Sequence, residues 1–224
     1  RLTREAKAAG GHVHFILGNH EAMVLGNDLR YVHAKYNGVV RALDHSLPAL
    51  LGADTELGRW LRTRNAVERI GPYLFVHAGI APELAGEALD IEALNVRVRS
   101  VIGVPKGEIE DEAAKTVVWG LRGPLWYRGY FRAFAKRYGP TTKPAELDAI
   151  LAAAKAKTIV VGHTVVPQIT PMFGGRVLAV DLRWTKPEKM QAVWISGTTL
   201  ELADIRGRRA TLRMPPDQER GSHR

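Results

Sequence analysis

Short apolar runs alternate along this chain with polar loops, in a pattern typical of a mixed α/β protein. Three of the runs, residues 13–17, 73–76 and 158–161, are rich in β-branched and aromatic residues and predict short buried strands. A loop that carries a histidine follows each of them directly. In an open α/β sheet, the loops at the carboxyl ends of the strands form the ligand crevice. The pattern therefore predicts that three distant segments meet at one edge of a sheet.

Each of these loops offers one nitrogen or oxygen donor: Asn19, His77 and His163. Two imidazoles and a side-chain carbonyl suit a borderline divalent metal such as Zn, Mn or Fe. His20 stands beside this set and is free for proton transfer. One histidine after a strand is more often an ordinary loop residue than a ligand, but three such loops together favour a metal site. The combination is typical of a metal-assisted hydrolase.

The remaining pattern predicts helices and further short strands. Helices are expected at residues 2–9, 91–101, 109–115 and 145–156, and over most of 21–61 with breaks at Gly26-Asn27, Asn37-Gly38 and Pro48-Ala49. A hairpin is expected from 66–70 and 73–76 around Gly71-Pro72, and strands at 177–180, 191–195, 199–204 and 210–213. We expect a single domain over residues 1–224, with a frayed tail from about residue 214.

Composition narrows the classes of function. The chain has 224 residues, of which 46% are hydrophobic, which is enough for one sizeable core. It contains no cysteine, so thiolate ligands and disulfides are excluded. No apolar run approaches the ~18 residues of a membrane span. The net charge of +9 comes from scattered residues without the arginine–aromatic alternation that stacks bases. We therefore expect phosphorylated substrates as partners, and neither nucleic acid nor a membrane.

The motifs resemble those of phosphoprotein phosphatases of the calcineurin-like metallophosphoesterase superfamily, in particular the bacterial Shewanella-like branch. The matching segments are residues 17–23, 75–82 and 161–164, and residues 119–130 resemble the segment that precedes the final metal ligand in that branch. The resemblance runs over almost the whole chain. It implies an α/β fold in which two mixed β-sheets form a sandwich flanked by helices.

Two aspartate-rich motifs of that family, Gly-Asp-x-His-Gly and Gly-Asp-x-x-Asp-Arg-Gly, do not occur in this chain. The resemblance implies a dinuclear centre of two divalent metal ions, Mn, Fe or Zn, and this chain supplies ligands for one of them. We therefore expect an N-terminally incomplete metallophosphatase domain that by itself is inactive or a weak enzyme.

By resemblance, Asn19, His77 and His163 ligate that one metal, and His20 is the acid that donates to the leaving alcohol. Arg128 is expected to be catalytic and to bind the substrate, because a guanidinium presents parallel donors to two phosphate oxygens. Arg122 is the second candidate for substrate binding. Either arginine could instead be a surface residue lying along a tryptophan.

The predicted function is that of a metal-dependent phosphomonoesterase of the protein-phosphatase kind, acting on a phosphorylated protein or small molecule. Two alternatives stay open. A diadenosine-tetraphosphatase-like hydrolase would use the same centre, and a catalytically dead pseudophosphatase or binding module would result if the upstream motifs are truly missing. Residues 119–130 favour the protein-phosphatase-like branch.

Overall fold

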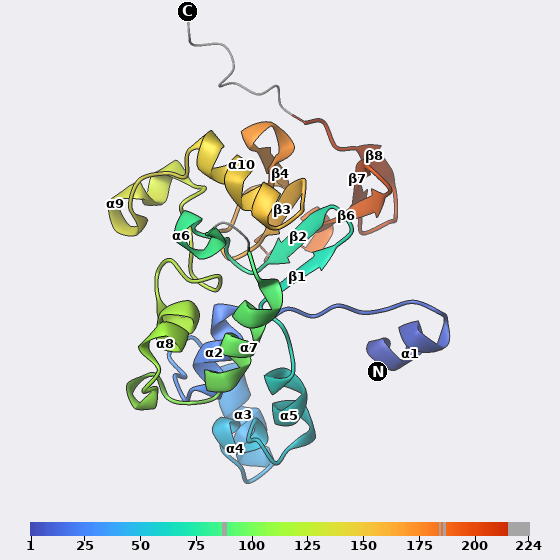
Figure 1. The fold of residues 1–224 in the computed structure, drawn as a ribbon. Helices are drawn as coiled ribbons and strands as arrows, with labels where there is room; N and C mark the ends of the chain where they lie inside the picture. Colours follow the sequence, from blue (N-terminus) through green and yellow to red (C-terminus); the bar gives the residue numbers. More distant parts are fainter. Residues whose placement is uncertain (87–88, 184, 186, 215–224) are drawn as a thin grey trace, which may run out of the picture.

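The computed structural model describes residues 1–86, 89–183, 185 and 187–214 (Figure 1). Its larger sheet has five strands in the order β1-β2-β3-β5-β4. These strands are β1 (Val67–Ile70), β2 (Tyr73–Val76), β3 (Thr158–Val161), β4 (Thr170–Met172) and β5 (Val177–Ala179). The three inner strands β2, β3 and β5 run parallel, whereas β1 and β4 pair antiparallel at the edges. Because its centre is parallel, the carboxyl ends of three strands meet at one side of this sheet.

A second sheet contains β6 (Gln191–Ser196), β7 (Thr199–Asp204) and β8 (Arg209–Thr211), all antiparallel. Exposed and half-buried side chains alternate along β6, so one face of this sheet is covered. The predicted α/β fold with two sheets and flanking helices is confirmed. Only the larger sheet is mixed.

Helices flank the larger sheet and gather at one end of the molecule (Figure 1). They are α1 (Leu2–Ala8), α2 (Asn19–Leu25), α3 (Lys35–Ala42), α4 (Leu47–Leu50), α5 (Glu56–Arg62), α6 (Pro82–Ala85), α7 (Ile91–Val101), α8 (Glu112–Trp119), α9 (Ala135–Tyr138) and α10 (Pro144–Ala153). Short 3-10 turns occur at Lys106–Glu108, Arg132–Phe134, Phe173–Gly175 and Pro187–Lys189. In Figure 1, α2 to α5 gather at the end away from the sheets, and α1 stands apart on an extended segment.

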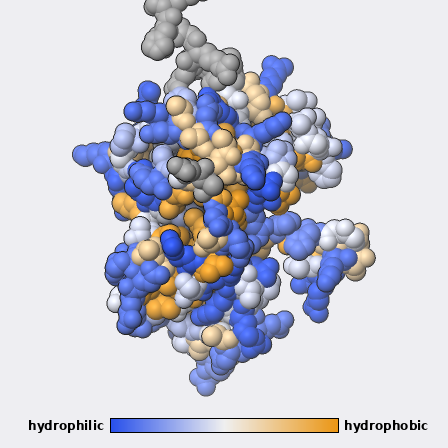
Figure 2. Space-filling view, in the orientation of Figure 1, coloured by the Kyte–Doolittle hydropathy of each residue, from blue (hydrophilic) through white to orange (hydrophobic). Residues whose placement is uncertain are grey.

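The core is centred on β3, in which all four side chains are buried. The buried amide of Asn95 fastens α7 to β1: its Oδ1 accepts from the backbone N–H groups of Ala66 and Val67, and its Nδ2 donates to the carbonyl of Val67. At the surface, apolar residues form separate patches between hydrophilic ones (Figure 2). No helix of the described residues is long and apolar enough to cross a bilayer.

Several predicted elements are corrected by the structure. Residues 13–17 form only a single bridge, between Ile16 and Asn65, in which the N–H of Leu17 donates to the carbonyl of Asn65 over 2.8 Å. The predicted strand is not formed because residues 13–15 find no backbone partner among the described residues.

Two of the predicted helix breaks are also wrong. Asn37-Gly38 lies inside α3 and Pro48-Ala49 lies inside α4. Proline is tolerated there because the first turn of a helix has N–H groups without intrahelical partners. The break at Gly26-Asn27 is confirmed, and Asn27 adopts φ +64°. The predicted frayed tail, apart from residue 214, lies outside the described residues.

Candidate metal centre

The loops after β2 and β3 are brought together by the parallel register of the two strands. Val76 pairs with Val161, the last residues of their strands. The next residues continue the pairing, since the N–H of Gly162 donates to the carbonyl of His77 over 2.8 Å. His77 and His163 therefore leave the sheet at the same edge. Asn19, the first residue of α2, reaches this edge from the segment that pairs with Asn65.

The three donor atoms predicted from the sequence converge in the structure. Asn19 Oδ1 lies 2.8 Å from His77 Nε2 and 3.2 Å from His163 Nδ1. The two ring nitrogens are 3.1 Å apart. We call these three atoms the donor triangle. Its three members are separated by 58 to 144 positions in the sequence.

The donor triangle fits a divalent metal in chemistry and size. Ligands held at right angles about 2.1 Å from a metal lie about 3 Å apart, close to the observed edges. Burial lowers the pKa of His77 to about 4 and that of His163 to about 3, and the charges of Arg128 and His20 act in the same direction. Both rings are therefore neutral at pH 7, the form that binds metal.

The donor set has only two histidines. Among the described residues, no group of three or more histidine, cysteine, aspartate or glutamate side chains is placed to hold a metal ion. The amide oxygen of Asn19 is thus the third donor of the triangle. This set can occupy one face of a coordination sphere, and its other positions would need water, substrate or further ligands.

The backbone around the donor triangle is constrained. His163 adopts φ +61°, a left-handed conformation that is uncommon for residues other than glycine and that often marks functional sites. Gly18 has no room for a side chain, because an added Cβ would lie 2.8 Å from Cε1 of His77 and 2.8 Å from Oε2 of Glu21. Glu21 in turn accepts from the N–H of Gly18 over 2.9 Å, which holds the start of α2 against His77.

His20, the predicted acid, is exposed in the first turn of α2. Its ring stacks on that of Tyr31, with centroids 5.3 Å apart and planes inclined by 11°. Its charge contributes to the lowered pKa of both His77 and His163, which places it near the donor triangle. No hydrogen bond joins His20 to a carboxylate within the described part of the chain.

Arg128 lies against the loop of His163. Its Nη2 donates to the carbonyl of His163 over 3.2 Å, its Nε to Thr164 Oγ1 over 3.2 Å, and its Nη1 to the hydroxyl of Tyr138 over 2.8 Å. The guanidinium also lies 5.1 Å from the ring centroid of Phe134. These contacts use three of its five N–H groups, so two remain for an anion.

Arg122, the second predicted substrate-binding residue, is occupied by other partners. It forms an ion pair with Glu83 at 2.6 Å, and its Nη1 donates to the carbonyl of Tyr138 over 3.1 Å. Its guanidinium also lies 5.4 Å from the ring centroid of Tyr127. The structure therefore brings Arg128, and not Arg122, into contact with the loop of a donor residue.

Two tyrosines that the sequence did not single out as functional support the loop after His77. The hydroxyl of Tyr130 accepts from the N–H of Ile80 over 3.0 Å and donates to the carbonyl of the same residue over 2.9 Å. Tyr127 packs edge-on against Tyr130 and bonds to Thr142. No local pattern signals these contacts, because the partners lie 15 to 50 positions away.

Trp126 packs beside His163, and Asp181 lies near Arg128. Trp126 packs edge-on against the His163 ring at 5.9 Å between centroids. His163 Nε2 is buried, and among the described residues it has no hydrogen-bond partner of ordinary geometry. The backbone of Trp126 raises the pKa of the ring, but burial and the neighbouring charges lower it by more. Burial raises the pKa of the Asp181 carboxyl, an effect partly offset by the charge of Arg128.

No protein-family model matches the chain. The structure is similar to that of a cold-active protein tyrosine phosphatase from a psychrophilic Shewanella species, with a TM-score of 0.84 and 36% identity over 95% of this chain and 62% of that one. A point mutant of a cold-active protein tyrosine phosphatase matches with a TM-score of 0.83 and 35% identity. An uncharacterized protein of Schizosaccharomyces pombe is 29% identical over 194 residues, or 80% of this chain and 53% of the yeast protein.

The chain thus spans 62% of the length of the solved phosphatase and about half of the yeast relative. Similarity in sequence and structure extends over nearly all of this chain. The resemblance predicted from the motifs is confirmed: the chain has the calcineurin-like fold of the Shewanella phosphatases and is similar to the Shewanella-like protein phosphatases of the metallophosphoesterase kind.

Proposed function

We propose that this chain carries part of the catalytic centre of a metal-dependent phosphoester hydrolase. The observation that supports this most strongly is the donor triangle of Asn19, His77 and His163, whose edges of 2.8 to 3.2 Å suit ligands of one divalent ion. Similarity to Shewanella phosphatases supports the same reaction class.

Asn19, His77 and His163 would hold one divalent metal, Mn, Fe or Zn. When bound, such a metal lowers the pKa of a coordinated water and offsets the charge of phosphate oxygens. The proposed centre is dinuclear, so the second metal would take its ligands from residues other than those described. His77 and His163 contribute as neutral donors, which their burial favours at pH 7.

His20 is proposed to donate a proton to the leaving oxygen. It is exposed and close enough for its charge to affect His77 and His163, and its ring is oriented by stacking on Tyr31. Arg128 is proposed to bind two non-bridging phosphate oxygens with its two remaining N–H groups. Its bonds to the His163 carbonyl and to Thr164 position the guanidinium beside the donor triangle.

The similar solved structures are of protein tyrosine phosphatases. We therefore propose aryl phosphoesters, of which phosphotyrosine is the protein form, as the first substrates to test. The test is hydrolysis of p-nitrophenyl phosphate with added Mn, by the chain and, where its gene extends further upstream, by the longer product. We expect turnover that His163→Ala abolishes and that His45→Ala, an exposed histidine on another loop, leaves intact.

Turnover that survives in His163→Ala would contradict the proposal. Mn binding without turnover in any form of the protein would instead favour the pseudophosphatase alternative. Because the described residues offer donors for one metal only, we expect the 224-residue chain alone to be much weaker than a form with a complete centre.

A further inference from the structure

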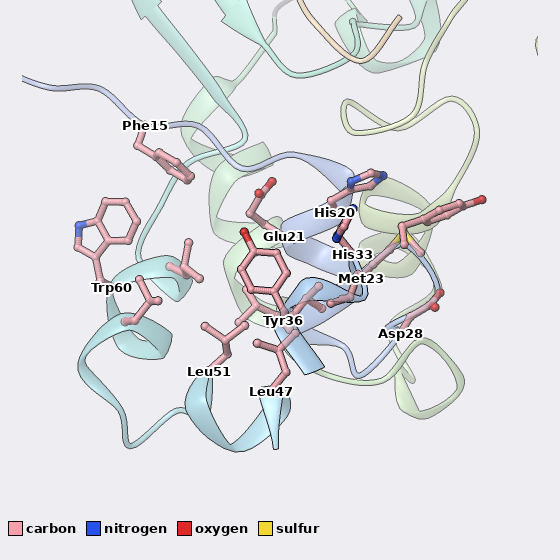
Figure 3. Close-up of a pocket in the computed structure, with 16 residues that line it drawn as sticks. Phe15, His20, Glu21, Met23, Asp28, His33, Tyr36, Leu47, Leu51 and Trp60 are labelled. Carbon is pink, nitrogen blue, oxygen red and sulfur yellow. The ribbon is translucent and has the colours of Figure 1, made fainter. Parts of the chain in front are cut away.

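A cavity of about 570 Å³ lies beside His20, outside the donor triangle. It is open to solvent on one side and is lined by residues of α2, α3, α4 and α5, the loops between them and the extended segment before α2 (Figure 3). Its volume is within the range of small-molecule sites, which is about 300–1,000 Å³. We call this space the α2–α5 cavity.

The lining of the α2–α5 cavity is divided by polarity. Figure 3 shows His20, His33 and Asp28 on one side, and Phe15, Trp60 and Leu51 on the other. The Asp28 carboxylate is paired with Arg30 at 2.7 Å, His33 Nδ1 accepts from the N–H of Lys35, and Glu21 accepts from the N–H of Gly18. Of the polar groups in the lining, His20 is therefore the one most open to a ligand. On the other side Phe15 and Trp60 pack with ring centroids 4.9 Å apart and form an apolar wall.

The Phe15–Trp60 wall is half-buried, and other parts of the lining are more exposed to solvent. Helix α3 has no buried residue, and Tyr36, which lines the cavity, is 44% exposed. Aromatic and aliphatic side chains from four segments therefore face a space that another apolar group could fill at a gain in free energy.

His20 connects the α2–α5 cavity to the proposed proton transfer. His20 follows Asn19 directly in α2 and also lines the cavity. The group that accepts a proton from His20 is the alcohol of the phosphoester, so the alcohol must lie on the His20 side of the phosphate. Any apolar body attached to that oxygen is then next to the part of the α2–α5 cavity that His20 and Glu21 line.

Resting on the hydrolase function above, we propose that the α2–α5 cavity binds the alcohol portion of the phosphoester, and that the preferred substrates have an apolar alcohol larger than a single aromatic ring. Trp60 and Tyr36 are the residues that select this group. A single phenyl ring would leave most of the volume empty, whereas a fused ring or a neighbouring apolar side chain would reach the Phe15–Trp60 wall.

The test compares two phosphonates that cannot be hydrolysed, phenylphosphonate and 2-naphthylphosphonate, by calorimetric titration of the protein in the presence of Mn. The second ring buries enough apolar surface for a dissociation constant on the order of tenfold lower. Trp60→Ala and, because Trp60 packs near the core, the more exposed Tyr36→Ala should each reduce this ratio to near one. Trp194→Ala, an exposed tryptophan on β6, is the matched control and should keep the ratio.

Each outcome separates the two proposals. Equal affinity of the unaltered protein for both phosphonates, or a ratio that persists in both cavity variants, overturns the cavity proposal and leaves the hydrolase standing. If 2-naphthol binds in a Trp60-dependent manner but neither phosphonate binds, the cavity takes an apolar ring without a phosphate site beside it, and the hydrolase proposal is wrong.

Discussion

His77 Nε2 and His163 Nδ1 lie 3.1 Å apart, although 86 residues separate them in the sequence. The parallel register of β2 and β3 brings the two loops together, and Asn19 Oδ1 completes the triangle within 3.2 Å. Both rings are neutral at pH 7, so each can turn the lone pair of its nitrogen toward a metal once the N–H is carried by the other ring nitrogen. A divalent cation at this point would be attracted by all three donors, in place of the hydrogen bonds that join them without metal.

The lowered pKa values predict how the metal-free protein responds to acid. In the unfolded chain both histidines titrate near pH 6.5, whereas in the folded protein they titrate near 4 and 3. Between about pH 6.5 and pH 4 the unfolded state binds protons that the folded state does not. The free energy of unfolding should therefore decrease as the pH is lowered through this range, by up to about 1.4 kcal/mol per pH unit for each histidine.

Thermal unfolding between pH 7.5 and pH 4.5, with a chelator present, measures this effect. The variant His163→Ala retains only one of the two groups and should lose less stability over the same range. Parallel profiles for the variant and the unaltered protein would show that burial does not depress the pKa of His163.

Substitution of Gly18 should disturb the donor triangle from outside it. In Gly18→Ala the new Cβ would lie within 3 Å of both Cε1 and Nδ1 of His77, so the ring must move. We expect a loss of about 1–3 kcal/mol in the free energy of unfolding and at least tenfold weaker Mn binding. Gly38→Ala is the matched control, because its Cβ meets nothing within 4 Å and α3 should gain about 0.5–1 kcal/mol.

Unchanged Mn affinity in Gly18→Ala would show that the site tolerates displacement of His77. Urea unfolding and a Mn titration of both glycine variants provide the two readouts.

Removal of one hydroxyl should destabilise the loop after His77. Tyr130→Phe leaves the N–H and the carbonyl of Ile80 without their partner in a buried place. Leaving buried polar groups unpaired costs about 1–3 kcal/mol, which urea unfolding can resolve. Tyr36→Phe, at an exposed position, should change the free energy of unfolding by less than about 0.5 kcal/mol. Equal stability of the two variants would mean that water replaces the Tyr130 hydroxyl.

Arg128 should affect phosphate binding more than metal binding. A charge-assisted hydrogen bond is worth roughly 1.5–3 kcal/mol, so Arg128→Ala should lower kcat/KM for an aryl phosphate on the order of 10- to 150-fold. Arg128 also donates to the His163 carbonyl, so the Mn affinity of Arg128→Ala is measured as well. We expect that affinity to stay unchanged. An unchanged kcat/KM would transfer the role to Arg122 or to another cation.

The sequence predicted those helices and strands whose bounds are set by residues close to them in the chain. The hairpin of β1 and β2 follows from the turn residues Gly71-Pro72 between two predicted strands, and α7 has the predicted bounds, with Asp90 as its N-cap. Helix α8 begins later than predicted because the Asp111 carboxylate accepts from the N–H groups of Ala113 and Ala114 and fixes the start there. Strand β4 was missed because Pro171 at its centre is unusual in a strand, and an edge position tolerates it.

The candidate site was predictable as far as it depends on strand ends. Asn19, His77 and His163 each follow an apolar run, and the parallel pairing of β2 and β3 explains why the two histidines converge. Asn19 reaches them from a segment that makes only the bridge between Ile16 and Asn65. The contacts of Arg128 and Tyr130 were not predictable, since the hydroxyl of Tyr130 meets Ile80 across 50 positions with no repeating pattern. The commitment of Arg122 to Glu83 likewise depends on how α6 packs.

The central claim is that the donor triangle binds a divalent metal. The most direct test is a titration with Mn in which binding is monitored by electron paramagnetic resonance. We predict one Mn ion per chain from these three donors, with binding abolished in His163→Ala while circular dichroism shows an intact fold. Undiminished Mn binding in that variant, or no binding by the folded unaltered protein, would contradict the account.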